Sequence, residues 1–369
     1  MTGSSLLERA RDLLPAMVDA VEALVTVESP SEDVDACRAV AQEAVGIFEG
    51  WLPEPARIEE HEGRPVWRWG AAQPRVLLLG HLDTVWPMGS LQRLPFTNDG
   101  ERITGPGCFD MKAGVVQGWA AMAMLGLTEA DGIGMLLTTD EEIGSHRSRA
   151  LLADASAQAE AVLVLEPSVD GALKTSRKGT SWYQVAFTGR AAHAGLDPDK
   201  GINALLAASQ LALDSSAWAD SSEGTTVTPT LMSAGTTANT VPASASLTVD
   251  VRAWTSAEQQ RVDASFRSWQ PGYGAGLEIG GGIDRPALEP ESSAALFVQA
   301  RAAAKTLDLP ALEGRAVGGA SDGNITAAAG HPTLDGLGAV GDGAHADHEW
   351  VSVPALAERA ALLASLLNT

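Results

Sequence analysis

The chain has 369 residues, more than one hydrophobic core usually supports, so two domains are expected. Its 45% hydrophobic content is that of an ordinary globular protein and excludes a disordered or fibrous chain. A formal net charge of −22 argues against nucleic acid or an anionic membrane as partner, and it suits a protein that binds cations.

The two cysteines, Cys37 and Cys108, are too few for a disulfide framework or a thiolate zinc site. Residues 1–20 lack the basic segment and apolar core of a signal peptide, and no apolar run is long enough to span a bilayer. We therefore expect a reducing compartment, a cytoplasmic location and no membrane partner. Cys37 lies on a predicted helix and is expected in the core.

Helical and apolar segments alternate through residues 1–177 and 287–369, and they indicate an α/β domain. Helices are expected at 6–27, 34–51, 111–127, 294–307 and 354–367, and short apolar strands at 75–79, 133–137 and 161–165. Helical connections between such strands predict a mostly parallel sheet.

Residues 178–286 follow a different pattern. The expected elements are a strand at 180–189, a helix at 201–219, strands at 225–234 and 244–254, a helix at 256–269 and a strand at 277–281. This β-α-β-β-α-β order is the ferredoxin-like plan, and it predicts an α+β domain inserted into the first. The segments Gly280–Gly282 and Arg285–Pro286 are expected to form its return hinge.

Candidate metal ligands follow the predicted strands of the first domain. His81 and Asp83 come after strand 75–79, Glu141 and Glu142 after strand 133–137, and Glu166 after strand 161–165. Open α/β sheets build their sites at the carboxyl ends of strands. These side chains are therefore expected to share one site.

Two further candidates are Asp110, after the turn Gly105–Gly107, and His345, in a late glycine-rich loop. The combined nitrogen and oxygen donors suit Zn²⁺, Co²⁺ or Mn²⁺, whereas an all-oxygen site would favour Mg²⁺ or Ca²⁺. One catalytic zinc needs about three protein ligands. Five ligands with one bridging carboxylate would serve two ions, and a remaining glutamate could act as general base for a water.

Four of these segments resemble motifs of the M20 metallopeptidases, and most closely those of the carboxypeptidase G2 (glutamate carboxypeptidase) branch. In chain order they are GHLDTV at 80–85, GPGCFDMK at 105–112, DEEIGS at 140–145 and LEP at 165–167. The resemblance runs through nearly the whole chain, the inserted domain included. It implies a di-zinc peptidase catalytic domain with an inserted lid and dimerisation domain.

The resemblance also implies individual roles. Five residues would hold two Zn²⁺ per subunit (or Co²⁺ or Mn²⁺), with Asp110 bridging: His81, Asp110 and Glu166 at one ion, and Asp110, Glu142 and His345 at the other. Glu141 would be the general base and acid. Asp83 would orient the His81 ring, because metal-bound histidines are usually held through their other nitrogen.

His348 is a rival to His345 as the late ligand. The family pattern has a glutamate four residues after the ligand, and Glu349 stands four residues after His345, which favours His345. Cys108 takes the place of the apolar residue that more usually precedes Phe109. Since the five ligands are complete without it, Cys108 is expected to pack in the interior.

Further residues resemble substrate-binding positions of the family. His193, in AAHAG, matches a histidine that reaches across a dimer to the substrate carbonyl, where it would stabilise an oxyanion. Asn239 and Arg252 match positions that hold the substrate carboxylate, which the planar guanidinium of arginine can pair in a bidentate way. Lys174 and Arg285 resemble further carboxylate-side positions.

The loop 318–324 (GGASDGN) resembles the family's substrate loop, where Gly319 would let the backbone approach a ligand. The sequence thus predicts a homodimeric, metal-dependent hydrolase that cleaves a peptide or N-acyl amino acid with a free carboxylate beside the scissile amide. Two alternatives stay open. One is an aminoacylase, dipeptidase or deacylase acting on a specialised metabolite, and the other is an inactive, metal-bound binding module.

Overall fold

The structure is a computed structural model of the chain and describes residues 3–368. Contacts between Cα atoms divide the chain into two compact units. Unit 1 comprises the chain up to Ser176, Glu289–Val317 and the chain from Ser321 onwards, and unit 2 comprises Arg177–Leu288 and Gly318–Ala320. Gly318–Ala320 therefore group with unit 2, although the sequence-based division assigned them to the catalytic domain.

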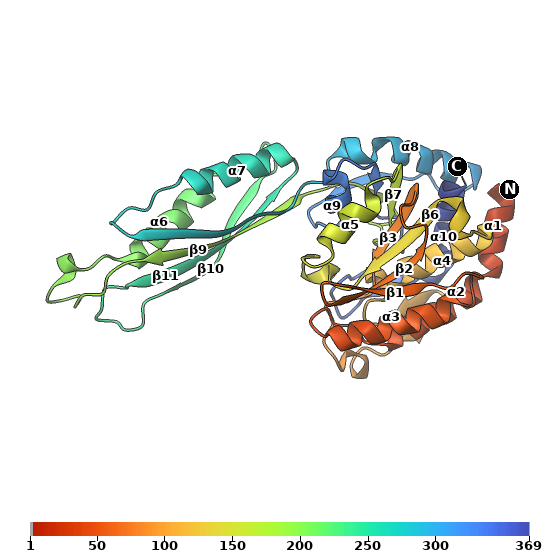
Figure 1. Ribbon diagram of the computed structural model, residues 1–369, viewed down its shortest axis with the longest axis horizontal. Helices are drawn as coiled ribbons and strands as arrows, with labels where there is room; N and C mark the ends of the chain where they lie inside the picture. Colours follow the sequence, from red (N-terminus) through yellow and green to blue (C-terminus); the bar gives the residue numbers. More distant parts are fainter. Residues whose placement is uncertain (1–2, 369) are drawn as a thin grey trace. The chain divides into compact units, whose positions relative to one another are not determined.

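Unit 1 combines helices with one large and two small sheets (Figure 1). Its helices are α1 (Gly3–Asp12), α2 (Leu14–Thr26), α3 (Val34–Phe48), α4 (Ala113–Leu125), α5 (Arg149–Ser156), α8 (Pro290–Thr306), α9 (Asp322–Ala328) and α10 (Val353–Leu367). The large sheet has the order β1 (Arg57–His61), β2 (Arg64–Gly70), β6 (Ile133–Thr138), β3 (Val76–His81), β7 (Ala161–Val164) and β14 (Thr333–Leu334). The small sheets are β13 (Gly314–Val317) with β8 (Leu173–Arg177), and β15 (Gly341–Asp342), β16 (Trp350–Ser352), β5 (Arg102–Thr104) and β4 (Thr97–Asn98).

The large sheet is mostly parallel, as predicted, because five of its six strands run in one direction while β2 runs against them. β3 pairs in parallel with β6 and β7, and β7 pairs in parallel with β14. In contrast, β1 pairs antiparallel with β2, and β2 antiparallel with β6. The three strands that were predicted are parallel, and the hairpin β1–β2 extends the sheet at one edge.

Side chains of β3 alternate between two cores, one on each face of the sheet. Val76 and Leu78 belong to the larger cluster, which includes residues of α1 to α4, α8 and α10. Leu77 and Leu79 belong to a smaller cluster with residues of α5 and α9. Because both faces are covered, the parallel strands consist of continuous apolar residues, and their ends are the first places where polar side chains occur.

The N-terminal helical segment is two helices, whereas the sequence predicted one over 6–27. α1 ends at Asp12 and α2 begins at Leu14, with Pro15 in its first turn. Proline is tolerated in a first turn but disrupts a helix interior, since it lacks an N–H and clashes with the preceding turn. Among residues 3–368, no helix has both the length and the apolar character needed to cross a bilayer.

Unit 2 has the predicted element order: β9 (Gly179–Thr188), α6 (Ala204–Ser216), β10 (Thr226–Ala234), β11 (Ser244–Ala253), α7 (Ser256–Ser268) and β12 (Gly276–Arg285). Its strands form one antiparallel sheet in the order β10-β11-β9-β12. The two helices pack on this sheet (Figure 1). Tyr183 of β9 stacks on Phe266 of α7 with ring centroids 3.8 Å apart.

The glycines 280–282 lie inside β12 and pair with β9, so the predicted hinge at this position is wrong. Gly281 has a φ of +77°, and a Cβ at this residue would lie 2.0 Å from the carbonyl oxygen of Trp182. The register shifts between Ile283 and Arg285. The glycine run therefore serves close strand pairing beside a bulge.

Candidate metal centre

The predicted ligands of unit 1 follow three neighbouring strands. His81 is the last residue of β3, Glu141 and Glu142 lie in the turn after β6, and Glu166 comes two residues after β7. Because β3 is parallel to both β6 and β7, the carboxyl ends of the three strands meet at one edge of the sheet. The apolar strands therefore bring these polar side chains together, as predicted.

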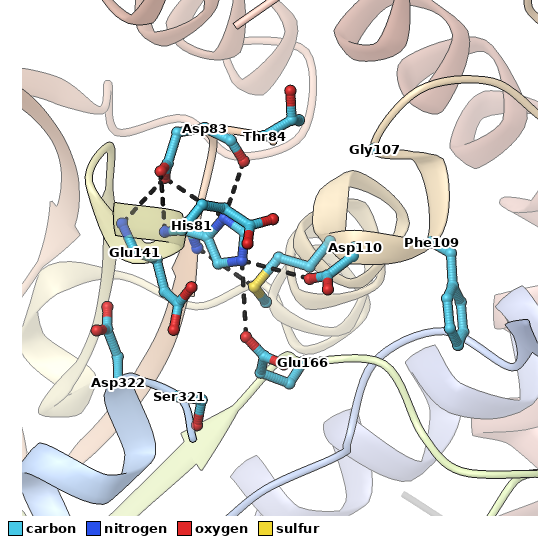
Figure 2. A network of polar contacts seen from close by, with 12 residues as sticks. His81, Asp83, Thr84, Gly107, Phe109, Asp110, Glu141, Glu166, Ser321 and Asp322 are labelled. Atoms are coloured by element: carbon cyan, nitrogen blue, oxygen red, sulfur yellow. Dashed lines mark hydrogen bonds and ion pairs between the residues drawn. The ribbon is translucent and has the colours of Figure 1, made fainter. Parts of the chain in front are cut away.

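The His81 ring lies between two carboxylates on one side and Asp83 on the other (Figure 2). Its Nε2 is 3.4 Å from Oδ1 of Asp110 and 3.6 Å from Oε1 of Glu166. Its Nδ1 is 3.0 Å from the backbone oxygen of Asp83. A carbonyl oxygen can only accept, so Nδ1 carries a proton, and a ring without a proton on Nε2 would present its lone pair on the side of the two carboxylates.

His345 approaches the same cluster from the late loop. Its Nε2 is 3.5 Å from Oδ2 of Asp110 and 3.1 Å from Oε2 of Glu142. The two oxygens of Asp110 therefore face different histidines, Oδ1 towards His81 and Oδ2 towards His345. This is the arrangement that a carboxylate bridging two ions requires. His345 and its rival His348 are both exposed, so the contacts with Asp110 and Glu142, and not burial, favour His345.

The donor atoms fit a metal ion. Among the described residues, three buried atoms of the cluster have no hydrogen-bond partner: Nε2 of His81, Oδ1 of Asp110 and Oε1 of Glu142. Buried polar atoms without a partner are costly, and an ion would satisfy all three. Donor atoms of Glu141 also lie within 4.8 Å of His81 and Glu166, so distance alone does not separate a base from a ligand.

The cluster binds protons tightly when it holds no cation. Burial raises the pKa of Glu142 to about 7. Asp110 and Glu142 raise the pKa of His345 to about 10. Burial opposes protonation of His81, but Asp110, Asp83 and Glu166 outweigh it and raise the His81 pKa well above its usual value. Protons thus occupy donors that a metal ion needs.

We expect metal affinity to fall as the pH is lowered, and to fall more steeply below about pH 7 than above it. An ion must displace the His345 proton at any pH below about 10 and the Glu142 proton as well below about 7. Chelator-competition titrations on both sides of neutrality measure the slope. A slope that stays the same between about pH 6 and pH 9 would contradict this assignment.

Asp83 holds the segment that carries the two glutamates. Its Oδ2 accepts hydrogen bonds from the hydroxyl of Ser31 (2.7 Å) and the backbone N–H of Glu142 (3.2 Å), and its Oδ1 accepts from the N–H of Glu141 (3.3 Å). Burial alone would raise the pKa of Asp83, but His81 and these donors lower it. Asp83 is therefore a carboxylate that orients both His81 and the Glu141 turn.

Glu349 holds the loop that carries Asp110. One of its oxygens accepts from the N–H groups of Phe109 (2.9 Å) and Asp110 (3.1 Å), and the other accepts from the N–H of Gly107 (2.9 Å) and the indole of Trp86 (2.9 Å). The glutamate that follows His345 by four residues thus positions Asp110 from a distant part of the sequence.

Lys112 and Cys108 flank Asp110 without joining the donor set. Lys112 is buried, and its Nζ donates to the backbone oxygens of Leu24 and Val27, both at 2.9 Å. Burial lowers the pKa of this ammonium to about 8. Cys108 is fully buried in the larger core, and burial raises its thiol pKa, so the prediction that it packs in the interior is confirmed.

Asp322, the first residue of α9, is a contributor that the sequence did not reveal. Its buried carboxylate accepts hydrogen bonds from the hydroxyls of Thr138 (3.1 Å) and Ser145. Thr138 ends β6 and Ser145 follows the glutamate turn, so Asp322 connects both ends of the segment that carries Glu141. Figure 2 shows Asp322 on the same side of the cluster as Glu141. Thr138 lies 184 residues before Asp322 and Ser145 lies 177 residues before it, so no local sequence motif indicates these hydrogen bonds.

Lys174, a predicted substrate ligand, lies beside the metal centre in unit 1. Its Nζ is 3.5 Å from Oε2 of Glu166, and both side chains are buried. A cation next to an anionic ligand compensates part of its charge. The structure therefore gives Lys174 a contact with a predicted metal ligand, and its role toward a substrate stays a prediction.

The predicted residues His193 and Asn239 are neighbours in unit 2. The backbone N–H of Ala194 donates to the backbone oxygen of Asn239 at 2.9 Å. His193 and Asn239 are both exposed. Nδ1 of His193 accepts from the N–H groups of Gly195 and Leu196, both at 3.1 Å. An Nδ1 that accepts leaves the proton on Nε2, so the exposed side of the neutral ring is a donor.

The remaining predicted residues of unit 2 have partners of their own. The guanidinium of Arg252 pairs with the carboxylate of Asp250 through contacts of 2.9 to 3.1 Å. Arg285 is buried at the end of β12. The backbone oxygen of Gly319 accepts from Arg177 at 3.0 Å, which fixes the start of the glycine-rich loop.

Known proteins are similar to this chain in sequence and fold. Residues 77–369 match peptidase family M20/M25/M40. The chain is 29% identical over 395 aligned positions to carboxypeptidase G2 of Pseudomonas sp. (strain RS-16), covering 98% of this chain and 91% of that relative.

Two solved structures have a similar fold. One is the M20 family metallo-carboxypeptidase Sso-CP2 from Sulfolobus solfataricus, with a TM-score of 0.70, 15% identity and coverage of 95% of this chain and 98% of that one. The other is the Bacillus subtilis YXEP protein, a dinuclear metal binding peptidase from the M20 family, with a TM-score of 0.67, 15% identity and coverage of 97% and 98%. With its mixed α/β fold and a family match over more than half its length, the chain belongs to peptidase family M20/M25/M40.

Proposed function

We propose that this protein is a metal-dependent hydrolase that cleaves the amide bond of a peptide or N-acyl amino acid with a free carboxylate beside that bond. Membership of the family makes it a hydrolase of peptide or amide bonds. The observation that carries the proposal is Asp110, whose two oxygens face His81 and His345, with Glu141 within 4.8 Å of His81.

The donors suit two Zn²⁺ ions, with Co²⁺ or Mn²⁺ as alternatives for the same nitrogen and oxygen set. His81, Asp110 and Glu166 would hold one, and Asp110, Glu142 and His345 the other. When bound, such ions polarise an amide carbonyl and make a water more acidic.

Glu141 would carry the proton in this reaction. Its carboxylate takes a proton from the attacking water as the new C–O bond forms. It then delivers that proton to the amide nitrogen as the C–N bond breaks, which leaves an amine and a carboxylic acid as products. Asp83, through the N–H of Glu141, holds the base in place.

Unit 2 would act as lid and dimerisation domain. The apolar side chains of Leu206 and Leu213 on α6, and of Leu231 and Met232 on β10, are exposed, which supports a homodimer formed through these elements. The partner subunit's His193 would then donate to the oxyanion. Sedimentation velocity tests the dimer, and a monomer at every concentration would contradict it.

Arg252→Ala should lower kcat/KM for an N-acyl amino acid by about 10- to 100-fold, because a charge-assisted pair with the substrate carboxylate is lost. Steady-state kinetics with the acid and with its carboxamide analogue measure the effect. The two substrates should differ for the wild type and converge for the variant.

The matched control for that experiment is Arg261→Ala, in the same unit. Arg261 also pairs with a nearby carboxylate, that of Glu258, at 2.7 Å. This change should leave kcat/KM for both substrates close to the wild-type values. An unchanged kcat/KM for Arg252→Ala as well would show that Arg252 does not clamp the carboxylate.

A substrate panel tests the proposed reaction itself. Dipeptides, N-acyl amino acids and acylated amines without a carboxylate, each assayed with and without a chelator, separate a carboxypeptidase from an aminoacylase, dipeptidase or deacylase. Chelator-sensitive release of an amino acid supports the proposal. No turnover of any amide by the metal-loaded protein would favour the inactive binding module.

We also propose a cytoplasmic location, which the two buried free cysteines support and cell fractionation would test.

A further inference from the structure

A cavity in unit 1 is lined by none of the metal-centre residues. Its volume is about 450 Å³, within the range of small-molecule sites. It is lined by the turn after β7 at 169–172, by the segment 309–313 after α8, and by one side of α10. Leu309, Leu312 and Leu362 give it an apolar wall.

Arg359 of α10 lines this cavity and is only 5% exposed. Its Nη2 donates to the backbone oxygen of Gly171. Its Nη1 is buried and has no hydrogen-bond partner among the described residues. Burial lowers the pKa of the guanidinium to about 10, so it remains charged at neutral pH. A buried cation without a paired anion is costly, and a bound carboxylate would relieve that cost.

Two carboxylates also line the cavity near this arginine. Glu358 is half-buried on α10, and Asp170 is exposed in the turn next to Gly171. The other charged lining residues, Glu313 and Arg315, pair with each other at 2.7 Å. The cavity thus combines one buried cation, an apolar wall and two acidic groups.

We propose that this cavity binds a free α-amino acid with an apolar side chain. The carboxylate of the ligand pairs with Arg359, its ammonium group lies towards Glu358 and Asp170, and its side chain lies against the leucines. A simple anion would meet repulsion from the two acidic groups, and an apolar amine would leave Arg359 unpaired. A zwitterionic amino acid offers a carboxylate to Arg359 and an ammonium group to the two acidic side chains.

Calorimetric titration of the metal-free protein with leucine tests this site apart from the metal centre. We expect binding to one site, and weaker binding of leucinamide, which lacks the carboxylate, and of 4-methylpentanoate, which lacks the amine. Arg359→Gln should weaken leucine binding by about tenfold or more. Arg301→Gln, an exposed arginine of α8 outside the cavity lining, is the control and should leave the dissociation constant within about twofold of the wild type.

Ala311→Trp provides an independent variant, because Ala311 is an exposed lining residue and a large side chain there occupies the cavity without replacing a buried group. It should abolish leucine binding even if Arg359→Gln proves too unstable to test. Leucine binding unchanged by Ala311→Trp overturns the proposal. So does leucinamide binding as tight as that of leucine, or no leucine binding up to about 10 mM.

Discussion

Glu141→Ala is expected to reduce kcat by about 10²- to 10⁴-fold while leaving the metal content near that of the wild type. The variant loses the group that moves the proton from water to the leaving nitrogen, and it keeps the five predicted ligands. Activity assays and elemental analysis of the same dialysed samples measure both quantities. A loss of metal would place Glu141 among the ligands, where its distance to His81 and Glu166 would allow it.

The neighbouring Glu142 provides the control for this experiment. Glu142→Ala changes the same residue type one position along the same turn, but its carboxylate contacts His345 at 3.1 Å. We expect this variant to lose metal as well as activity. Substitution of one glutamate would then leave the metal content unchanged and substitution of its neighbour would lower it. A general disturbance of the turn would lower it in both variants.

Asp110→Ala is expected to remove metal from both predicted positions and to abolish turnover. Each of its oxygens faces a different histidine, so the substitution deletes a donor from both sets at once. Metal analysis after dialysis against a weak chelator should fall from about two ions per chain to nearly none. Circular dichroism shows whether the fold survives.

Glu166→Ala is the matched comparison for Asp110, because Glu166 belongs to one set only. Its Oε1 lies 3.6 Å from His81. The expected result is loss of about one ion and retention of the other. If Asp110→Ala also retained one tightly held ion, the bridging role would be wrong and Asp110 would serve a single position.

The sequence revealed the parallel strands and their polar ends because both depend on local patterns. β3, β6 and β7 are buried on both faces, so their residues are uniformly apolar and the change to His81 or Glu141 is abrupt. β1, with the sequence RIEEH, has no apolar run, and β2 carries Arg64 and Arg68. Their pairing depends on the rest of the sheet, which explains why the two antiparallel pairings were not predicted.

The site was predictable to the extent that it depends on residue type and spacing. His345 could be chosen over His348 from the position of Glu349, and the structure shows its Nε2 at the cluster. The hydrogen bonds of Asp322 could not be predicted, because they join segments from different parts of the chain. The contact of Lys174 with Glu166 likewise depends on the path of the chain after β7.

The buried Lys112 makes the first helices part of the support for the candidate metal centre. Lys112 lies two residues after Asp110. Its ammonium group donates to one backbone oxygen near the end of α2 and to another just after this helix. The region matched by the family begins only at residue 77. A protein truncated to that region would leave this cation in an apolar interior without its acceptors. Amino-terminal deletions should therefore weaken metal retention, although no residue before position 77 is a predicted ligand.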